Sequence, residues 1–176
     1  MRRLGFLALV LPILMSLPAA AAERSFRADY SVTLLGLPVA TARFDSTFSL
    51  TDFRIEGSLA SAGVARLLDR TTGTTRVEGV IRGESVQPRA FSSSYTSGRK
   101  RSRTSIRYSG DRVAAVSNTP EPRKGKTWVP VEEGHLRAAL DPLTATLVPA
   151  EDPAKVCDRT VRVFDGEMRA DLELTP

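Results

Sequence analysis

The sequence predicts a mainly β protein, built as a single curled antiparallel sheet or a partly open β-barrel with one or two short helices. Apolar and polar residues alternate along most of the chain, and this period of two is typical of strands with one buried face. Glycine, proline and Asp-Gly or Ser-Gly pairs separate the alternating stretches at short intervals, as turns do. We count about eight to ten such stretches, in a chain of one-domain length.

The N-terminus has the three parts of a secretory signal peptide. A basic start at 1–3 precedes an apolar run over 4–17, and small residues then place a cleavage site between Ala22 and Glu23. The alternative is a membrane anchor, but the run is about 14 residues long, whereas a spanning helix needs roughly 20. We therefore expect residues 1–22 to be removed and the mature chain to be exported.

Cleavage leaves residues 23–176, which are 154 residues and enough for a single β-rich domain with one core. No later apolar stretch is long enough to cross a bilayer as a helix. Loss of Arg2 and Arg3 lowers the formal net charge from +5 to +3, which is a weak argument for a nucleic-acid partner. We expect no nucleic-acid partner and no transmembrane helix in the mature chain.

Basic residues nevertheless concentrate in two clusters. The first consists of Arg99, Lys100, Arg101 and Arg103, and the second spans 123–126. Such clusters can bind phosphates or lipid headgroups. Neither contains an aromatic residue on which a nucleic-acid base could stack, and turn-forming residues flank both. We therefore interpret both clusters as solvated hairpin tips.

The first three strands are predicted to form a meander. Residues 26–34 alternate between apolar and polar, and the Gly-Leu-Pro sequence at 36–38 ends this strand. A second alternating stretch covers 40–50, a Thr-Asp turn follows at 51–52, and a third stretch begins at 53. One face of the meander is apolar and the other polar, as in an antiparallel sheet with one face in water.

The alternation fails over 61–69, which predicts a short helix or a buried connection. Strand character returns at 71–77, and Pro88 opens another strand that runs to Tyr95. The first basic cluster follows at a hairpin tip. Two more strands are predicted around 106–108 and 113–116.

The C-terminal part is predicted to contain a loop, a helix and a hairpin. Residues 118–126 form the loop, after which Trp128 is expected to return to the core. Asp141 and Pro142 predict the start of a helix that runs to about Pro149 and packs on the sheet or plugs its open end. The Asp-Gly pair at 165–166 predicts the turn of a final hairpin.

The sequence carries few signs of catalysis. It contains no Gly-rich phosphate loop, no G-x-S-x-G motif and, with one histidine and one cysteine, no structural zinc spacing. Glu132, Glu133 and Asp141 could act as acids or bases if they converged, and His135 could pair with Cys157. We interpret the glutamates as surface residues and His135 as a surface or capping residue. We expect no catalytic residue, no metal and no cofactor.

Aromatic residues on the apolar face are candidates for the lining of a ligand site. A curled sheet can enclose a small apolar ligand in its mouth. The candidates are Phe26, Tyr30, Phe44, Phe48, Phe53, Phe91 and Tyr95. The alternative is that these side chains only fill the core, and aromatic residues make up just 6% of the chain, so few are spare for a roomy pocket.

Several segments resemble the DUF3108 family of exported bacterial proteins. The motifs are Leu140-Asp141-Pro142, Val163-Phe164-Asp165-Gly166 and Tyr30-x-Val32-x-Leu34-x-Gly36. The likeness covers residues 26–174. It implies a β-rich periplasmic protein of the Gram-negative envelope. Since no reaction is assigned to the family, it implies no catalytic residue.

The chain departs from the family pattern near its end. Family members tend to have basic residues after the Asp-Gly turn and a later cysteine, whereas this chain has Glu-Met-Arg-Ala at 167–170 and no later cysteine. The resemblance therefore implies that a terminal strand or two is missing and that Cys157 lacks its partner. From the residues alone, this single cysteine could equally pair between chains or stay buried.

Three functions are compatible with the sequence. The leading hypothesis is a periplasmic domain that binds an apolar ligand, such as a lipid, or an envelope component without catalysis. The second is a structural or assembly factor that acts on envelope proteins through sheet edges and basic loops. The third is a hydrolase of envelope polymers that uses Glu132, Glu133 or Asp141.

Overall fold

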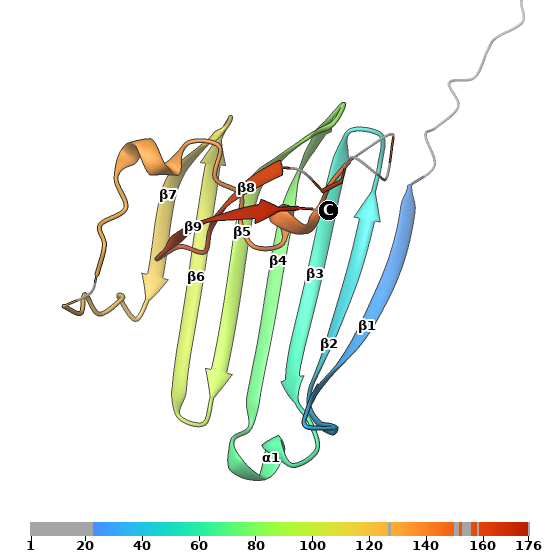
Figure 1. The fold of residues 1–176 in the computed structure, drawn as a ribbon, viewed down its shortest axis with the longest axis vertical. Coiled ribbons are helices and arrows are strands. Elements are labelled where there is room, and N and C mark those ends of the chain that lie inside the picture. The colour runs from blue at the N-terminus through green and yellow to red at the C-terminus, as the bar shows by residue number, and fades with distance from the viewer. Residues whose placement is uncertain (1–22, 127, 150–151, 153–155, 158, 176) are drawn as a thin grey trace, which may run out of the picture.

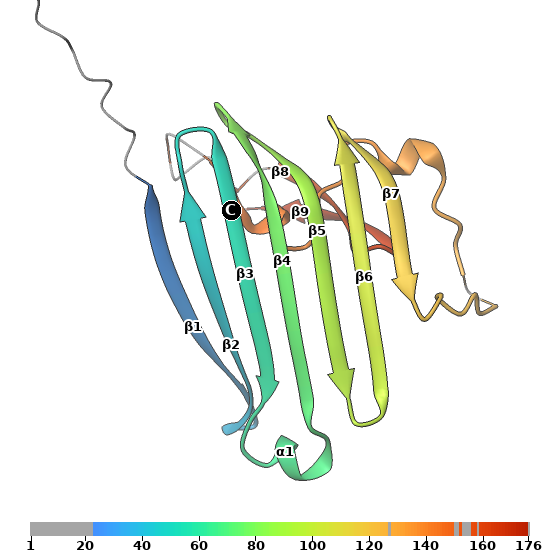
Figure 2. The same cartoon turned by 180° about the vertical axis from the view of Figure 1, so that it is seen from behind.

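The computed structural model describes residues 23–126, 128–149, 152, 156–157 and 159–175 (Figures 1 and 2). Seven strands form one sheet, in sequence order. They are β1 (Arg24–Leu34), β2 (Leu37–Phe48), β3 (Asp52–Ser61), β4 (Thr71–Arg82), β5 (Ser85–Ser97), β6 (Lys100–Ser109) and β7 (Arg112–Thr119). Two further strands, β8 (Arg159–Phe164) and β9 (Arg169–Leu174), form a separate hairpin. The predicted signal peptide, with Ala22, lies outside the described residues.

The large sheet is an open antiparallel meander. Each strand pairs with its sequence neighbours, and β1 and β7 form the two edges. This arrangement confirms the predicted mainly β class and corresponds to a single open sheet rather than to a partly open barrel. A four-residue helix, α1 (Ala65–Leu68), joins β3 to β4, as the loss of alternation over 61–69 predicted.

One face of the sheet is partly covered by the segment that follows β7. We call this segment the cover. It contains the 3-10 turns η1 (Glu133–Leu136) and η2 (Thr144–Thr146) and the β8–β9 hairpin. The hairpin crosses the sheet in front of β3 to β6 in Figure 1 and lies behind them in Figure 2. The sheet therefore has a cover-side face and an opposite face, which we call the polar face.

The core is a row of side chains on the cover-side face. The strand register aligns Ile55, Val77, Phe91 and Ile106 across β3 to β6, and all four are buried. Phe164 of β8 belongs to the same buried cluster and closes it from the cover. We call these four sheet residues the core row. Apolar burial between two layers, at about 25 cal/mol per Å², is the principal force that holds the cover on the sheet.

Two sequence predictions about the C-terminal part are wrong. In place of the helix predicted from Asp141 to about Pro149, the structure has only the three-residue turn η2. Leu147 is already extended, and Pro149 disfavours the α conformation at the residue before it. The β8–β9 hairpin, not a helix, therefore packs on the sheet. Trp128 is half-buried and outside the core cluster, because the loop that carries it runs beside β7 rather than across the sheet (Figure 1).

Candidate functional site

The cover-side face continues beyond the cover. Two further rows of the strand register follow the core row toward the α1 end of the sheet. The first contains Phe44, Gly57, Thr75, Ser93 and Thr104. The second contains Tyr30, Ala42, Leu59, Gly73 and Tyr95. We call the second row the open row, because its large side chains are exposed.

The open row is apolar and accessible. Tyr30 is 57% exposed, Leu59 38% and Tyr95 42%. The small residues Ala42 and Gly73 separate these side chains, and a Cβ at Gly73 would lie 3.7 Å from the Tyr95 ring. Neighbouring strands lie about 4.8 Å apart, so the row extends for about 19 Å from β1 to β5. It presents two aromatic rings and a leucine on alternate strands of the sheet.

The structure divides the aromatic ligand candidates into two groups. Buried in the core or packed against it are Phe44, Phe48, Phe53 and Phe91. Exposed on β1 and β5 are Phe26, Tyr30 and Tyr95. The Tyr30 ring contacts the Phe44 ring edge to face, with centroids 5.8 Å apart, so it is anchored to the half-buried row. Only the exposed group can meet a ligand without unpacking the core.

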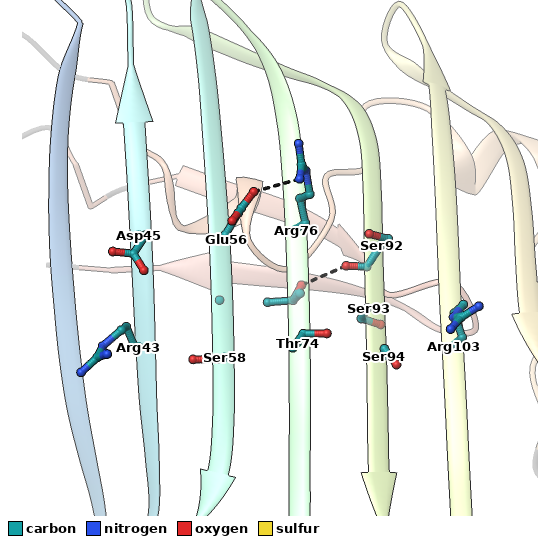
Figure 3. Close-up of a pocket in the computed structure, with 12 residues that line it drawn as sticks. Arg43, Asp45, Glu56, Ser58, Thr74, Arg76, Ser92, Ser93, Ser94 and Arg103 are labelled. Carbon is teal, nitrogen blue, oxygen red and sulfur yellow. Dashed lines mark hydrogen bonds and ion pairs between the residues drawn. The ribbon is translucent and has the colours of Figure 1, made fainter.

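The polar face carries a shallow hollow of 550 Å³ across β2 to β6 (Figure 3). Serine and threonine hydroxyls and charged side chains line it. Arg76 Nη1 lies 2.9 Å from Glu56 Oε1, and Arg43 Nε lies 2.6 Å from Asp29 Oδ1. The hydrogen bond and charge of Asp29 raise the pKa of Arg43, so this guanidinium stays protonated. These exposed cross-strand pairs neutralise much of the charge in the hollow and are typical of a hydrated sheet face.

A second hollow, of 590 Å³, lies where the loop after β7 meets the β8–β9 turn. Trp128, Val131 and Met168 supply apolar walls. Arg169 pairs with Asp171 at 2.7 Å, and its Nε is buried without a hydrogen-bond partner among the residues described. Loop residues build most of this hollow, and none of them belongs to the open row.

Asp141 is buried and holds the η2 turn together. Its Oδ1 accepts hydrogen bonds from the N–H groups of Leu143 and Thr144, both at 3.0 Å, and its Oδ2 accepts one from Thr144 Oγ1 at 2.6 Å. Burial raises the pKa of Asp141, and these hydrogen bonds oppose the rise. Burial, with the nearby charge of Asp141, also raises the pKa of Tyr108. The predicted capping role of Asp141 is confirmed, although the capped element is shorter than expected.

The two C-terminal motifs meet in space and build the cover. The N–H of Leu140 donates to the carbonyl of Arg162, and the N–H of Phe164 donates to the carbonyl of Leu140, both at 2.8 Å. Asp165 Oδ1 accepts from the N–H of Met168 at 2.8 Å and so closes the β8–β9 turn. The motifs therefore join η2 to β8 and fix the hairpin geometry.

The region that contains the open row and these motifs matches a known family of proteins. Residues 26–175 match the family model described as Protein of unknown function (DUF3108). The chain belongs to the DUF3108 family. No curated protein and no solved structure has significant similarity to it. Both motifs and every residue of the open row lie within the matched region of this DUF3108 protein.

The acid–base candidates of this DUF3108 protein do not converge. Glu133 is exposed and lies 3.5 Å from Arg112, whereas Asp141 is fully buried. His135 Nδ1 accepts the N–H of Glu132 at 3.1 Å, which confirms its capping role. The structure therefore gives no support to a hydrolase built on these carboxylates.

Cys157 is a half-buried free thiol, and no hydrogen bond joins it to His135 within the described part of the chain. The same residues contain no group of three or more His, Cys, Asp or Glu side chains that could hold a metal ion. Among them there is also no helix with the length and apolar character that crossing a bilayer requires.

The structure confirms the hairpin tip for three of the four residues in the first basic cluster. Arg99 occupies the β5–β6 turn, and Lys100 and Arg101 begin β6. Arg103 lies farther along β6 and faces the polar hollow (Figure 3). All four side chains are exposed. The sequence reasoning missed the exposed leucines at this end of the sheet, because alternation alone predicts apolar positions to be buried.

Proposed function

We propose that this DUF3108 protein is an exported, non-catalytic envelope protein that binds an apolar ligand on the open row. The N-terminal pattern, with a cleavage site between Ala22 and Glu23, supports export. The family resemblance supports a periplasmic location. The accessible side chains of Tyr30, Leu59 and Tyr95 support the binding role, because they extend the apolar face of the core into solvent.

The observation that carries the binding proposal is the incomplete covering of one sheet face. An antiparallel sheet with one wet face keeps that face polar and buries the apolar one. Here the polar face carries cross-strand ion pairs, while the apolar face is covered over the core row but not over the open row. A ligand on the open row would remove this surface from water, at about 25 cal/mol per Å². The row length of about 19 Å suits one extended acyl chain lying across the strands.

Native mass spectrometry tests the ligand directly. Residues 23–176, purified from the periplasm without reducing agent, are expected to carry extra mass that is lost on denaturation. The double variant Tyr30→Ser/Tyr95→Ser should lose this mass, because it removes both rings of the open row. Since both side chains are exposed, the variant should fold, and loss of the Tyr30–Phe44 ring contact should lower its temperature of unfolding by only a few degrees.

Met168→Ser is the matched control, because Met168 is exposed and lines the second hollow instead. This variant should retain the bound mass. Mass that is lost in Met168→Ser and kept in the double variant would contradict binding on the open row. A bare wild-type monomer would contradict the proposed ligand altogether.

A further inference from the structure

Three loops lie next to one another at the α1 end of the sheet (Figures 1 and 2). The N–H of Ala62 donates to the carbonyl of Val39 at 2.9 Å and joins the α1 loop to β2. Ser97 Oγ donates to the carboxylate of Asp69 and joins the same loop to the β5–β6 turn. We call this surface the loop end. It consists of residues 34–37, 62–70 and 97–101.

The loop end exposes an unusual number of large apolar side chains. They are Leu34, Leu35, Leu37, Val64, Leu67 and Leu68. Their exposed fractions lie between 45% and 95%. Single exposed apolar residues are common on protein surfaces, but six on adjoining loops form a patch of the kind found at interaction sites.

Leu35 shows that the exposure of leucine here carries a conformational cost. It occupies the two-residue β1–β2 turn with a φ of 51°, and its side chain is 95% exposed. Turns of this kind favour Asn, Asp or Gly at positions with positive φ, because a larger side chain is strained there. The sequence therefore places a leucine at the tip of the hairpin although local conformation disfavours it.

The loop end is also the basic part of the molecule. Its charged residues are Arg66, Asp69, Arg70, Arg99, Lys100 and Arg101, all of them exposed. These residues give the loop end a net charge of +4, against +3 for the whole of residues 23–176. The remainder of the mature chain is therefore close to neutral, and the positive charge adjoins the exposed leucines.

We propose that the loop end docks on the surface of an anionic phospholipid bilayer. The leucines would enter the boundary between headgroups and acyl chains, as the apolar faces of interfacial helices do. The basic side chains would contact lipid phosphates. Both halves of this chemistry, apolar insertion and attraction to anions, are present on the same three loops.

The positive charge of the loop end favours an anionic bilayer over other binding partners. A second copy of the chain would bring two surfaces of +4 together, which repel each other. A nucleic acid would leave the leucines in water, and the loop end has no aromatic ring on which a base could stack. An anionic lipid surface satisfies the charges and the apolar side chains at once.

Docking in this way would bring the open row close to the bilayer. Tyr30 precedes Leu34 by four residues on β1, and Tyr95 of β5 lies four residues before Arg99 of the β5–β6 turn. At about 3.3 Å per residue, the open row lies about 13 Å from the proposed membrane contact. An apolar chain that leaves the bilayer could therefore reach the open row along the cover-side face. Docking on a bilayer requires from the proposed function only that the protein is located in the envelope, and it does not require a ligand on the open row.

Vesicle sedimentation with residues 23–176 tests the inference. The protein is expected to bind vesicles of phosphatidylglycerol and phosphatidylcholine, less strongly at high salt, and to bind phosphatidylcholine vesicles weakly. The variant Leu35→Ser/Leu67→Ser/Leu68→Ser should bind at least about tenfold more weakly. The variant Arg99→Ser/Lys100→Ser/Arg101→Ser should bind about 100-fold more weakly.

A control variant comes from the opposite end of the sheet. Leu50 and Arg82 are exposed there, and Leu50→Ser/Arg82→Ser should bind like the wild type. Wild-type binding by the leucine variant, or equal binding to both kinds of vesicle, would overturn the inference. Retention on immobilised polyglutamate without vesicle binding would overturn it in favour of an acidic polypeptide. Vesicle binding by Tyr30→Ser/Tyr95→Ser is expected to be normal, which separates this inference from the proposed ligand site.

Discussion

Replacing Phe164 with alanine is expected to lower the free energy of unfolding by about 4 kcal/mol. The side chain is 4% exposed and packs from β8 against the core row. Its loss would leave a cavity between the cover and the sheet, and the surrounding strands can collapse into it only partly. Chemical denaturation followed by circular dichroism would measure the change.

Leu172→Ala is the matched control in the other strand of the hairpin. Leu172 is half exposed, so its truncation should cost less than about 1 kcal/mol. If Phe164→Ala does not fold, Phe164→Leu keeps most of the volume and should cost about 1 kcal/mol. Equal free energies of unfolding for Phe164→Ala and Leu172→Ala would show that the cover does not complete the core.

The strands could be predicted from the sequence because each has one wet face. Alternation fixes which side chains share a face, and the glycines at 36 and 166 mark the turns that end strands, although residues 37–38, predicted to belong to the first turn, already pair in β2. The position of the β8–β9 hairpin on the sheet could not be predicted in this way, since it depends on contacts between residues far apart in the chain. The helix expected after Asp141 illustrates the same limit. The sequence correctly predicted that Asp141 caps the element, but no local signal predicted that the element is only three residues long.

Only part of the candidate site could be predicted from the sequence. Tyr30, Phe44 and Tyr95 were assigned to the apolar face of alternating stretches, and the strand register places all three on the cover-side face. Alternation cannot show which part of that face the cover leaves open. The loop end offered a usable signal that was missed. In a meander, every second turn lies at the same end of the sheet, so the turn at 35–36, the α1 loop and the turn at 98–99 had to be neighbours.

Replacing Asp141 with alanine is expected to lower the free energy of unfolding by about 3 kcal/mol. The variant removes an N-cap and leaves the buried hydroxyl of Thr144 without its acceptor. Asp141→Asn can keep the Oδ1 contacts, although its amide nitrogen cannot accept from Thr144, and should cost about 1 kcal/mol. Asp111→Ala, at an exposed position in the β6–β7 turn, should change stability little. A loss as small as that of Asp111→Ala would contradict the capping role.

Asp141 also predicts how stability depends on pH. Burial raises the pKa of Asp141 in the folded protein above its unfolded value. Between those two values the folded state binds more protons than the unfolded state, so the contribution of Asp141 is fully present below the unfolded pKa and is lost as the pH rises through the folded one. Asp141→Asn lacks this titration. The stability of the wild type relative to Asp141→Asn should therefore be greatest below the unfolded pKa of about 3.9 and fall as the pH rises above it. A relative stability that rises over this range would show that the three hydrogen bonds to the carboxylate outweigh its burial and hold the folded pKa below the unfolded one.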